Sequence, residues 1–115
     1  MEKDLTANDL ATLAPALGAD AEQVAAEVKA GISQLIRYAD GSRIVARVEY
    51  DAAGGELVIV AGAGRDAPGK VAALVEQATR RGWSVRFHTK RPALGRMLAR
   101  LGFTESERVY RYGGQ

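Results

Sequence analysis

The first thirty residues carry apolar side chains at helical spacing and predict two helices. The stretch Thr-Ala-Asn-Asp that begins at Thr6 has the pattern of a capping box, which predicts a helix over residues 9–17. Asp20 is the expected N-cap of a second helix over residues 21–30. A glycine follows each segment, as is typical of helix C-termini.

From residue 32 the period of the apolar positions changes to two, which is typical of strands. A first strand begins at Ile32 or Leu35 and runs to Tyr38, and Asp40-Gly41 marks a tight turn after it. The second strand is recognised by its alternating apolar positions, which are Ile44, Ala46, Val48 and Tyr50. A further turn is expected over residues 52–55, and the continuously apolar residues 57–61 predict a strand that is buried on both faces.

The rest of the chain alternates between helices and strands. The expected elements are a glycine-rich loop over 62–69, a helix over 70–81, a strand over 84–89, a helix over 92–101 and a strand over 108–112. The order ααβββαβαβ in 115 residues predicts a single domain of the α/β (α+β) class. Its sheet is expected to be mixed and mostly antiparallel, with helices on both faces.

The amino-acid composition excludes several kinds of functional site. The chain has no cysteine and one histidine, His88, which excludes disulfides, thiol nucleophiles and a two-histidine metal cluster, so no metal is expected. The longest apolar run, residues 57–61, is too short to cross a bilayer, and the first residues do not resemble a secretion signal. We therefore expect a cytoplasmic protein.

Charge is distributed unevenly along the chain. Residues 1–57 carry five basic and ten acidic side chains, a net charge of −5, whereas residues 58–115 carry eleven basic and four acidic ones, a net charge of +7. A positive half attracts phosphates, anionic cofactors, nucleic acid or an acidic protein surface. The alternative is an ordinary solvated surface.

The glycine-rich loop matches two phosphate-binding motifs in part. Gly64-x-x-x-x-Gly69-Lys70 fits a P-loop until Val71, which replaces the hydroxyl that holds magnesium. The spacing from Gly62 through Gly64 to an alanine imitates a dinucleotide fingerprint, but no carboxylate follows the next strand to bind a ribose. Neither motif is complete.

Anion binding at this loop is also expected without any motif, because glycines admit a ligand and helix N–H groups attract it. The alternative is a plain strand-to-helix turn, in which Asp66 serves the start of the helix. The predicted ligand-binding residues are Ala61, Gly62, Gly64, Arg65, Gly69, Lys70 and Arg96.

The run from Arg91 to Phe103, Arg-Pro-Ala-Leu-Gly-Arg-Met-Leu-Ala-Arg-Leu-Gly-Phe, together with the element order, resembles the GCN5-related N-acetyltransferase (GNAT) superfamily. The resemblance covers nearly the whole chain, except that the usual first strand of the family has no counterpart. It implies an acyl-CoA N-acyltransferase-like fold that binds acetyl-CoA through the glycine-rich loop. Of the family's Gln/Arg-x-x-Gly-x-Gly/Ala loop only Gly69 matches, since Asp66 and Val71 occupy the other two positions.

The catalytic positions depart from the family as well. Leu98 stands where the family often has a tyrosine that protonates the leaving thiolate, and a family-type general base could only be Glu49 or Glu56. His88 is the candidate catalytic residue, because a neutral imidazole can accept a proton near pH 7. Its alternative role is that of an ordinary surface histidine.

The resemblance thus implies a truncated and degenerate acetyltransferase-like domain. It would bind CoA or a similar phosphate-bearing ligand, with weak N-acetyl transfer by direct attack of an amine, since no cysteine can carry the acyl group. Backbone N–H groups near Ala61 and Gly62 would polarise the thioester carbonyl. The alternative function is a non-catalytic interaction protein, such as a phage-type accessory or structural protein, that binds nucleic acid or an acidic protein through its basic half.

Overall fold

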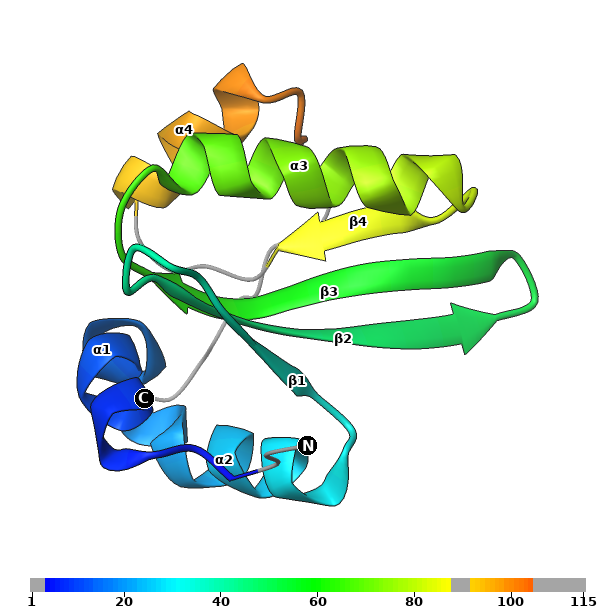
Figure 1. Cartoon of the computed structure of the whole chain (residues 1–115). Helices are drawn as coiled ribbons and strands as arrows, with labels where there is room; N and C mark the ends of the chain where they lie inside the picture. The colour runs from blue at the N-terminus through cyan, green and yellow to red at the C-terminus, as the bar shows by residue number, and fades with distance from the viewer. Residues whose placement is uncertain (1–3, 88–91, 105–115) are drawn as a thin grey trace, which may run out of the picture.

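The computed structural model describes residues 4–87 and 92–104. Helices and strands follow the predicted order throughout this part of the chain (Figure 1). The elements are α1 (Ala7–Leu17), the 3-10 turn η1 (Gly18–Asp20), α2 (Ala21–Ala30), β1 (Gln34–Arg37), β2 (Arg43–Asp51), β3 (Gly54–Ala63), α3 (Ala67–Arg80), β4 (Ser84–Phe87) and α4 (Pro92–Arg100). The strand predicted over residues 108–112 lies outside the described residues.

The four described strands form one mixed sheet in the order β1-β2-β3-β4. β1 with β2 and β2 with β3 are antiparallel hairpin pairs, whereas β3 and β4 are parallel and joined by the crossover helix α3. A bulge between Val45 and Ala46 shifts the β2–β3 register by one residue. The predicted α+β class and the mostly antiparallel sheet are confirmed for the described residues.

Helices cover both faces of the sheet (Figure 1). α1 and α2 lie on one face, over a core of Leu13, Leu17, Val24, Val28, Val45 and Ala61. α3 and α4 lie on the other face, over a second core of Ile44, Ile59, Val71, Leu74 and Leu98. On β2 the alternation of side chains places Ile44 and Val45 in different cores. On β3 the bulge places Ile59 and Ala61 in different cores, although they are two residues apart.

The first helix is anchored as its capping pattern predicts. The Thr6 side chain accepts a hydrogen bond from Asp9 N at 3.1 Å, and Asp9 in return accepts one from Thr6 N at 2.8 Å. The capping box starts α1 at Ala7, two residues before the predicted start. Asp20 precedes α2 as expected, but its side chain makes no capping hydrogen bond.

Two predicted loop boundaries were wrong. The β2–β3 turn contains only Ala52 and Ala53, so β3 begins at Gly54 and continues to Ala63. Helix α3 begins at Ala67 rather than Lys70, because Asp66 occupies its N-cap. Both errors have one cause, since the glycines that suggested loops lie within or next to regular structure.

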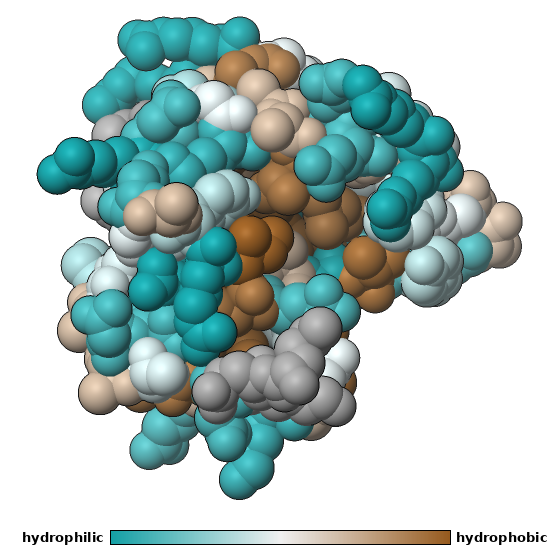
Figure 2. All heavy atoms as spheres, in the orientation of Figure 1, coloured by the Kyte–Doolittle hydropathy of each residue, from teal (hydrophilic) through white to brown (hydrophobic). Residues whose placement is uncertain are grey.

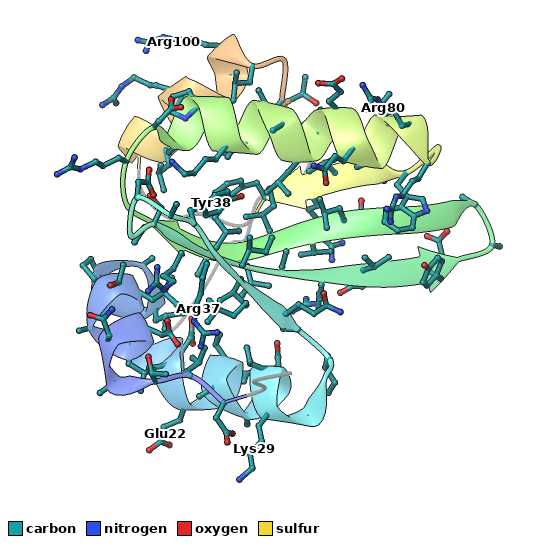
Figure 3. All side chains as sticks on the ribbon, in the orientation of Figure 1. Glu22, Lys29, Arg37, Tyr38, Arg80 and Arg100 are labelled. Carbon is teal, nitrogen blue, oxygen red and sulfur yellow. The ribbon has the colours of Figure 1, made fainter. Side chains whose placement is uncertain are left out.

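A buried ion cluster ties α1 to the β1–β2 hairpin. The Asp9 carboxylate is fully buried and accepts hydrogen bonds from Arg37 at 2.7 and 3.1 Å and from Arg43 Nε at 2.7 Å. Figure 3 shows Arg37 pointing toward the α1–α2 side of the sheet while the next residue, Tyr38, points toward α3.

In the described part of the chain, no helix is long and apolar enough to span a bilayer.

Candidate functional site

The predicted ligand loop connects β3 to α3 and is shorter than expected. Ala61 and Gly62 belong to β3, where they pair with Val45 and Ile44 of β2. Ala61 is 5% exposed and forms part of the core under α1 and α2. The loop itself is reduced to residues 64–66, so the first two predicted ligand residues lie within a regular sheet ladder.

The glycine at position 64 is required by the neighbouring hairpin. Gly64 has φ of 130°, and a Cβ atom there would come within 2.6 Å of the Ser42 Cα atom. This close approach lets the Ser42 hydroxyl accept a hydrogen bond from Arg65 N at 2.9 Å. Gly64 therefore serves the contact between the β1–β2 turn and the β3–α3 loop.

Asp66 organises the first turn of α3. Its backbone is left-handed, with φ and ψ both 50°, and its carboxylate accepts a hydrogen bond from Gly69 N at 3.2 Å. A Cβ atom on Gly69 would lie 2.4 Å from that carboxylate, so the glycine makes room for the cap. An acidic side chain thus occupies the helix N-terminus at which an anion was predicted to bind.

Lys70 is engaged within the protein. Its Nζ donates to Asp40 Oδ2 at 2.7 Å and to the Arg65 carbonyl oxygen at 2.6 Å, and it lies 5.2 Å from the Tyr38 ring centroid. The Lys70 ammonium, with help from Ser42, holds the pKa of Asp40 well below its ordinary value, and burial raises the pKa of Tyr38. Asp40 was predicted only as part of a tight turn, and neither Asp40 nor Ser42 was predicted as a partner of this loop, although the Asp-Gly-Ser turn lies between two predicted strands.

Two of the predicted ligand residues are exposed. Arg65 follows Gly64, and Arg96 lies on α4, which runs beside the N-terminal part of α3 (Figure 1). Arg100 is also exposed on α4 and points away from the body of the protein (Figure 3). Within residues 4–87 and 92–104, none of these three arginines has an acidic partner within ion-pair distance. They supply positive charge at the α3 N-terminal end.

The two candidate general bases, Glu49 and Glu56, lie on the face of the sheet opposite α3 and belong to a charge network. Arg86 contacts Glu49 at 3.0 Å and Glu56 at 3.1 Å, and Arg47 donates to Glu49 at 2.7 Å. The hydrogen bond from Arg47, with a further contribution from Arg86, lowers the pKa of Glu49 against the effect of burial. A carboxylate stabilised in this way is a weak proton acceptor.

The remaining predicted catalytic positions do not join a site. Leu98 is 6% exposed and packs in the core under α3. A side chain at this position therefore does not face a ligand. His88 lies outside the described residues, and its role stays a prediction. No group of three or more potential metal ligands occurs in the part of the chain that the structure describes.

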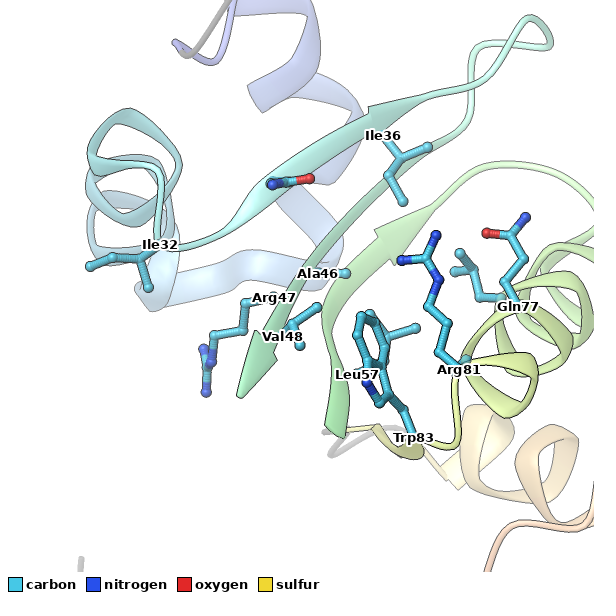
Figure 4. Close-up of a pocket in the computed structure, with 12 residues that line it drawn as sticks. Ile32, Ile36, Ala46, Arg47, Val48, Leu57, Gln77, Arg81 and Trp83 are labelled. Atoms are coloured by element: carbon cyan, nitrogen blue, oxygen red, sulfur yellow. The ribbon is translucent and has the colours of Figure 1, made fainter. Parts of the chain in front are cut away.

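A groove that the sequence did not reveal lies on the α3 side of the sheet. It has a volume of about 410 Å³ and lies between β1, the outer half of β2 and α3 (Figure 4). Its apolar lining residues include Ile32, Ile36, Val48, Leu57 and Trp83. Figure 2 shows apolar side chains gathered in a hollow on this face of the molecule.

Trp83 is half-buried at the end of this groove. It stacks edge-to-face on Tyr50, with ring centroids 6.0 Å apart, and Arg81 lies 5.2 Å from its ring. A Cβ atom on Gly55 would lie 2.4 Å from the indole nitrogen, so Gly55 makes room for the ring.

Comparisons with family models, with curated proteins and with solved structures found no match to this chain.

Proposed function

We propose that this domain binds CoA or a similar phosphate-bearing ligand, with the phosphates at the N-terminal end of α3. The observation that supports the proposal is that three positively charged features lie together at one end of the strands. The N-terminus of α3, the exposed Arg65 and the basic helix α4 all lie beyond the carboxyl end of β3. Ligands of open α/β sheets commonly bind outside the carboxyl ends of parallel strands, here β3 and β4.

A phosphate oxygen would take the place of the Asp66 carboxylate on Gly69 N. The cap is a single hydrogen bond of 3.2 Å that Gly69 N donates to the exposed Asp66 carboxylate, so an anion can compete for it. Arg65 and Arg96 are the side chains free to approach the charge, whereas Lys70 is held by Asp40. Lys70 therefore supports the loop and Arg65 and Arg96 hold the phosphates.

The residues fit a phosphate better than they fit an acyl-transfer centre. Leu98 is buried in the core, and Glu49 and Glu56 are bound by arginines. Ala61 and Gly62 pair with β2 through the register of the sheet. We accordingly propose that this acetyltransferase-like domain binds the ligand and that acetyl transfer is absent or very slow.

The test is thermal unfolding of the purified protein with and without millimolar CoA. A ligand at 100 times its Kd adds about 2.7 kcal/mol of stability, which raises the melting temperature of a domain of this size by about 10 °C. Asp66→Asn should strengthen binding because it removes a competing negative charge, and Arg65→Ala with Arg96→Ala should weaken it. Arg80→Ala is the matched control, since Arg80 is exposed at the other end of α3 and pairs only with Glu76 among the described residues.

An unchanged melting temperature in CoA would refute the proposal. The alternative, an interaction protein, is favoured by the exposed arginines of α4 and is examined with a DNA duplex and an acidic peptide. Retardation of DNA at low salt is expected from charge alone and decides nothing. Binding that persists at about 0.15 M salt and is lost in Arg96→Ala would establish the alternative in place of CoA binding.

A further inference from the structure

Strand β2 extends past its neighbour β1. β1 pairs only with residues 43–46 of β2, whereas β3 pairs with β2 as far as Asp51. Figure 1 shows the β2–β3 hairpin projecting beyond β1, with no helix alongside the outer side of β2. Among the described residues, no strand pairs with residues 47–51 on this side, and we call this strand edge the free β2 edge.

The end of α2 explains why β1 does not cover this edge. Ile32 N and Ser33 N both donate to the Glu27 carbonyl oxygen, at 2.9 and 3.1 Å, and the Ser33 hydroxyl donates to the Glu27 carboxylate at 2.9 Å. These bonds close α2, and residues 32 and 33 do not pair with β2. The hairpin register would otherwise have placed Ile32 opposite Val48.

The free β2 edge is apolar on one face. Tyr50 is 72% exposed and Val48 is 38% exposed, and Ile32 beside them is 61% exposed. Val48 lines the groove under α3 (Figure 4). Tyr50 contacts the Trp83 ring edge-to-face. A strand edge with exposed apolar side chains is a template for pairing with another strand, and proteins usually blunt or cover such edges.

We propose that a second copy of this chain covers the free β2 edge by antiparallel pairing about a twofold axis at Glu49. In this register Arg47 lies opposite Asp51 of the second copy, and Val48 lies opposite Tyr50 of the second copy. Each pair occurs twice by symmetry, so two opposite-charge pairs lie on one face and two apolar pairs on the other. The free edge is self-complementary in charge and in hydrophobicity. This proposal is independent of the CoA ligand.

Other registers are less favourable. Moving the axis to Val48 would place residues 50 and 51 of the second copy where β1 already lies. Moving it to Tyr50 would place Glu49 opposite Asp51, which sets like charges against each other. In the proposed register the two Glu49 side chains meet at the axis, and each is compensated by Arg47 at 2.7 Å and Arg86 at 3.0 Å.

Sedimentation velocity of the full chain at micromolar concentrations tests the proposal. The wild type should sediment at twice the monomer mass of 12.2 kDa. Arg47→Asp and Asp51→Lys each place like charges opposite each other and should raise the dimer Kd about tenfold or more. An equimolar mixture of the two variants should form a heterodimer again, because each then supplies the charge that the other lacks.

Tyr50→Lys provides a second test that does not depend on the charge network, and Leu10→Lys on α1 is its control. Both replace an exposed apolar side chain by a lysine, but only Tyr50 lies on the edge. Tyr50→Lys should give a monomer with an unchanged far-ultraviolet circular dichroism spectrum, and Leu10→Lys should remain a dimer. A wild type that stays monomeric at hundreds of micromolar overturns the proposal. So does a dimer that survives Tyr50→Lys, or a mixture of the charge variants that stays monomeric.

Discussion

Replacing the buried carboxylate of Asp9 should destabilise this protein more than any exposed ion-pair substitution. Asp9 holds the start of α1 through Thr6 and binds the guanidinium groups of Arg37 and Arg43. Its side chain is 0% exposed and that of Arg43 is 11% exposed. Asp9→Ala therefore removes the only acidic group that compensates Arg43 in the described part of the chain.

The magnitude follows from the charge that is left behind. Removing one partner of a buried ion pair costs about 3–5 kcal/mol, because the other charge remains desolvated. Loss of the capping box adds about 1 kcal/mol. The side chain of Arg37 is 37% exposed and can turn toward water, so its contribution is smaller. We expect Asp9→Ala to lower the free energy of unfolding by about 4–6 kcal/mol.

The pH dependence of stability identifies the same group. Hydrogen bonds from Arg37, and then from Thr6 and Arg43, hold the pKa of Asp9 well below its ordinary value in the folded protein and outweigh burial. The ionised carboxylate thus contributes its full stabilisation above the unfolded pKa of about 3.9, and that contribution is lost as the pH falls further. The stability difference between wild type and Asp9→Asn should shrink on acidification from pH 5 to pH 2.

Urea unfolding followed by circular dichroism measures these differences. Glu76→Ala is the matched control, since Glu76 pairs with Arg80 on an exposed helix face, and it should change stability by less than about 0.5 kcal/mol. The double variant Asp9→Ala with Arg43→Ala should cost less than the sum of the two single variants. If Asp9→Ala lost no more stability than Glu76→Ala, the buried cluster would not hold α1 to the hairpin and the reasoning would be wrong.

Two further predictions concern the loop and the chemistry. Gly64→Ala should cost clearly more stability in urea unfolding than Gly82→Ala, because both have positive φ but only Gly64 would push a Cβ atom against Ser42; equal losses would contradict the role given to that contact. Acetyl transfer to common amines should be undetectable or very slow, since buried Leu98 cannot protonate a thiolate and a missing acid costs about 10²–10⁴-fold in rate. Robust release of CoA in a thiol assay would show that another group transfers the proton.

Local patterns predicted the elements of this fold well, because caps and periodicity act between residues close in the chain. The capping box at Thr6, the glycine that ends α2 and the apolar strand within β3 all depend on neighbours within about four residues. The order of elements follows directly from such signals. Their boundaries were less accurate where a glycine belonged to a strand or a helix rather than to a loop, as at Gly55 and Gly69.

The long-range contacts that hold the fold and the candidate site together depend on the tertiary structure. Asp9 meets Arg37 and Arg43 across 28 and 34 positions of the chain, and Lys70 meets Asp40 across 30. A pattern of charges along the sequence cannot identify such partners, since every acidic residue is a formal candidate for every basic one. Only the pairing of β1 with β2 and the crossover through α3 selected these partners.

The glycine-rich loop shows most clearly why pattern and function separate. A glycine admits either a ligand or another segment of the same chain, and the sequence requirement, the absence of a Cβ atom, is identical in the two cases. Gly64 admits Ser42 of the hairpin, and Gly69 admits the Asp66 carboxylate. The sequence thus determined that another group approaches the backbone closely at both positions. At Gly69 that group is three residues away in the chain, whereas at Gly64 only the packing of the β1–β2 turn against this loop determined that it is Ser42 and not a ligand.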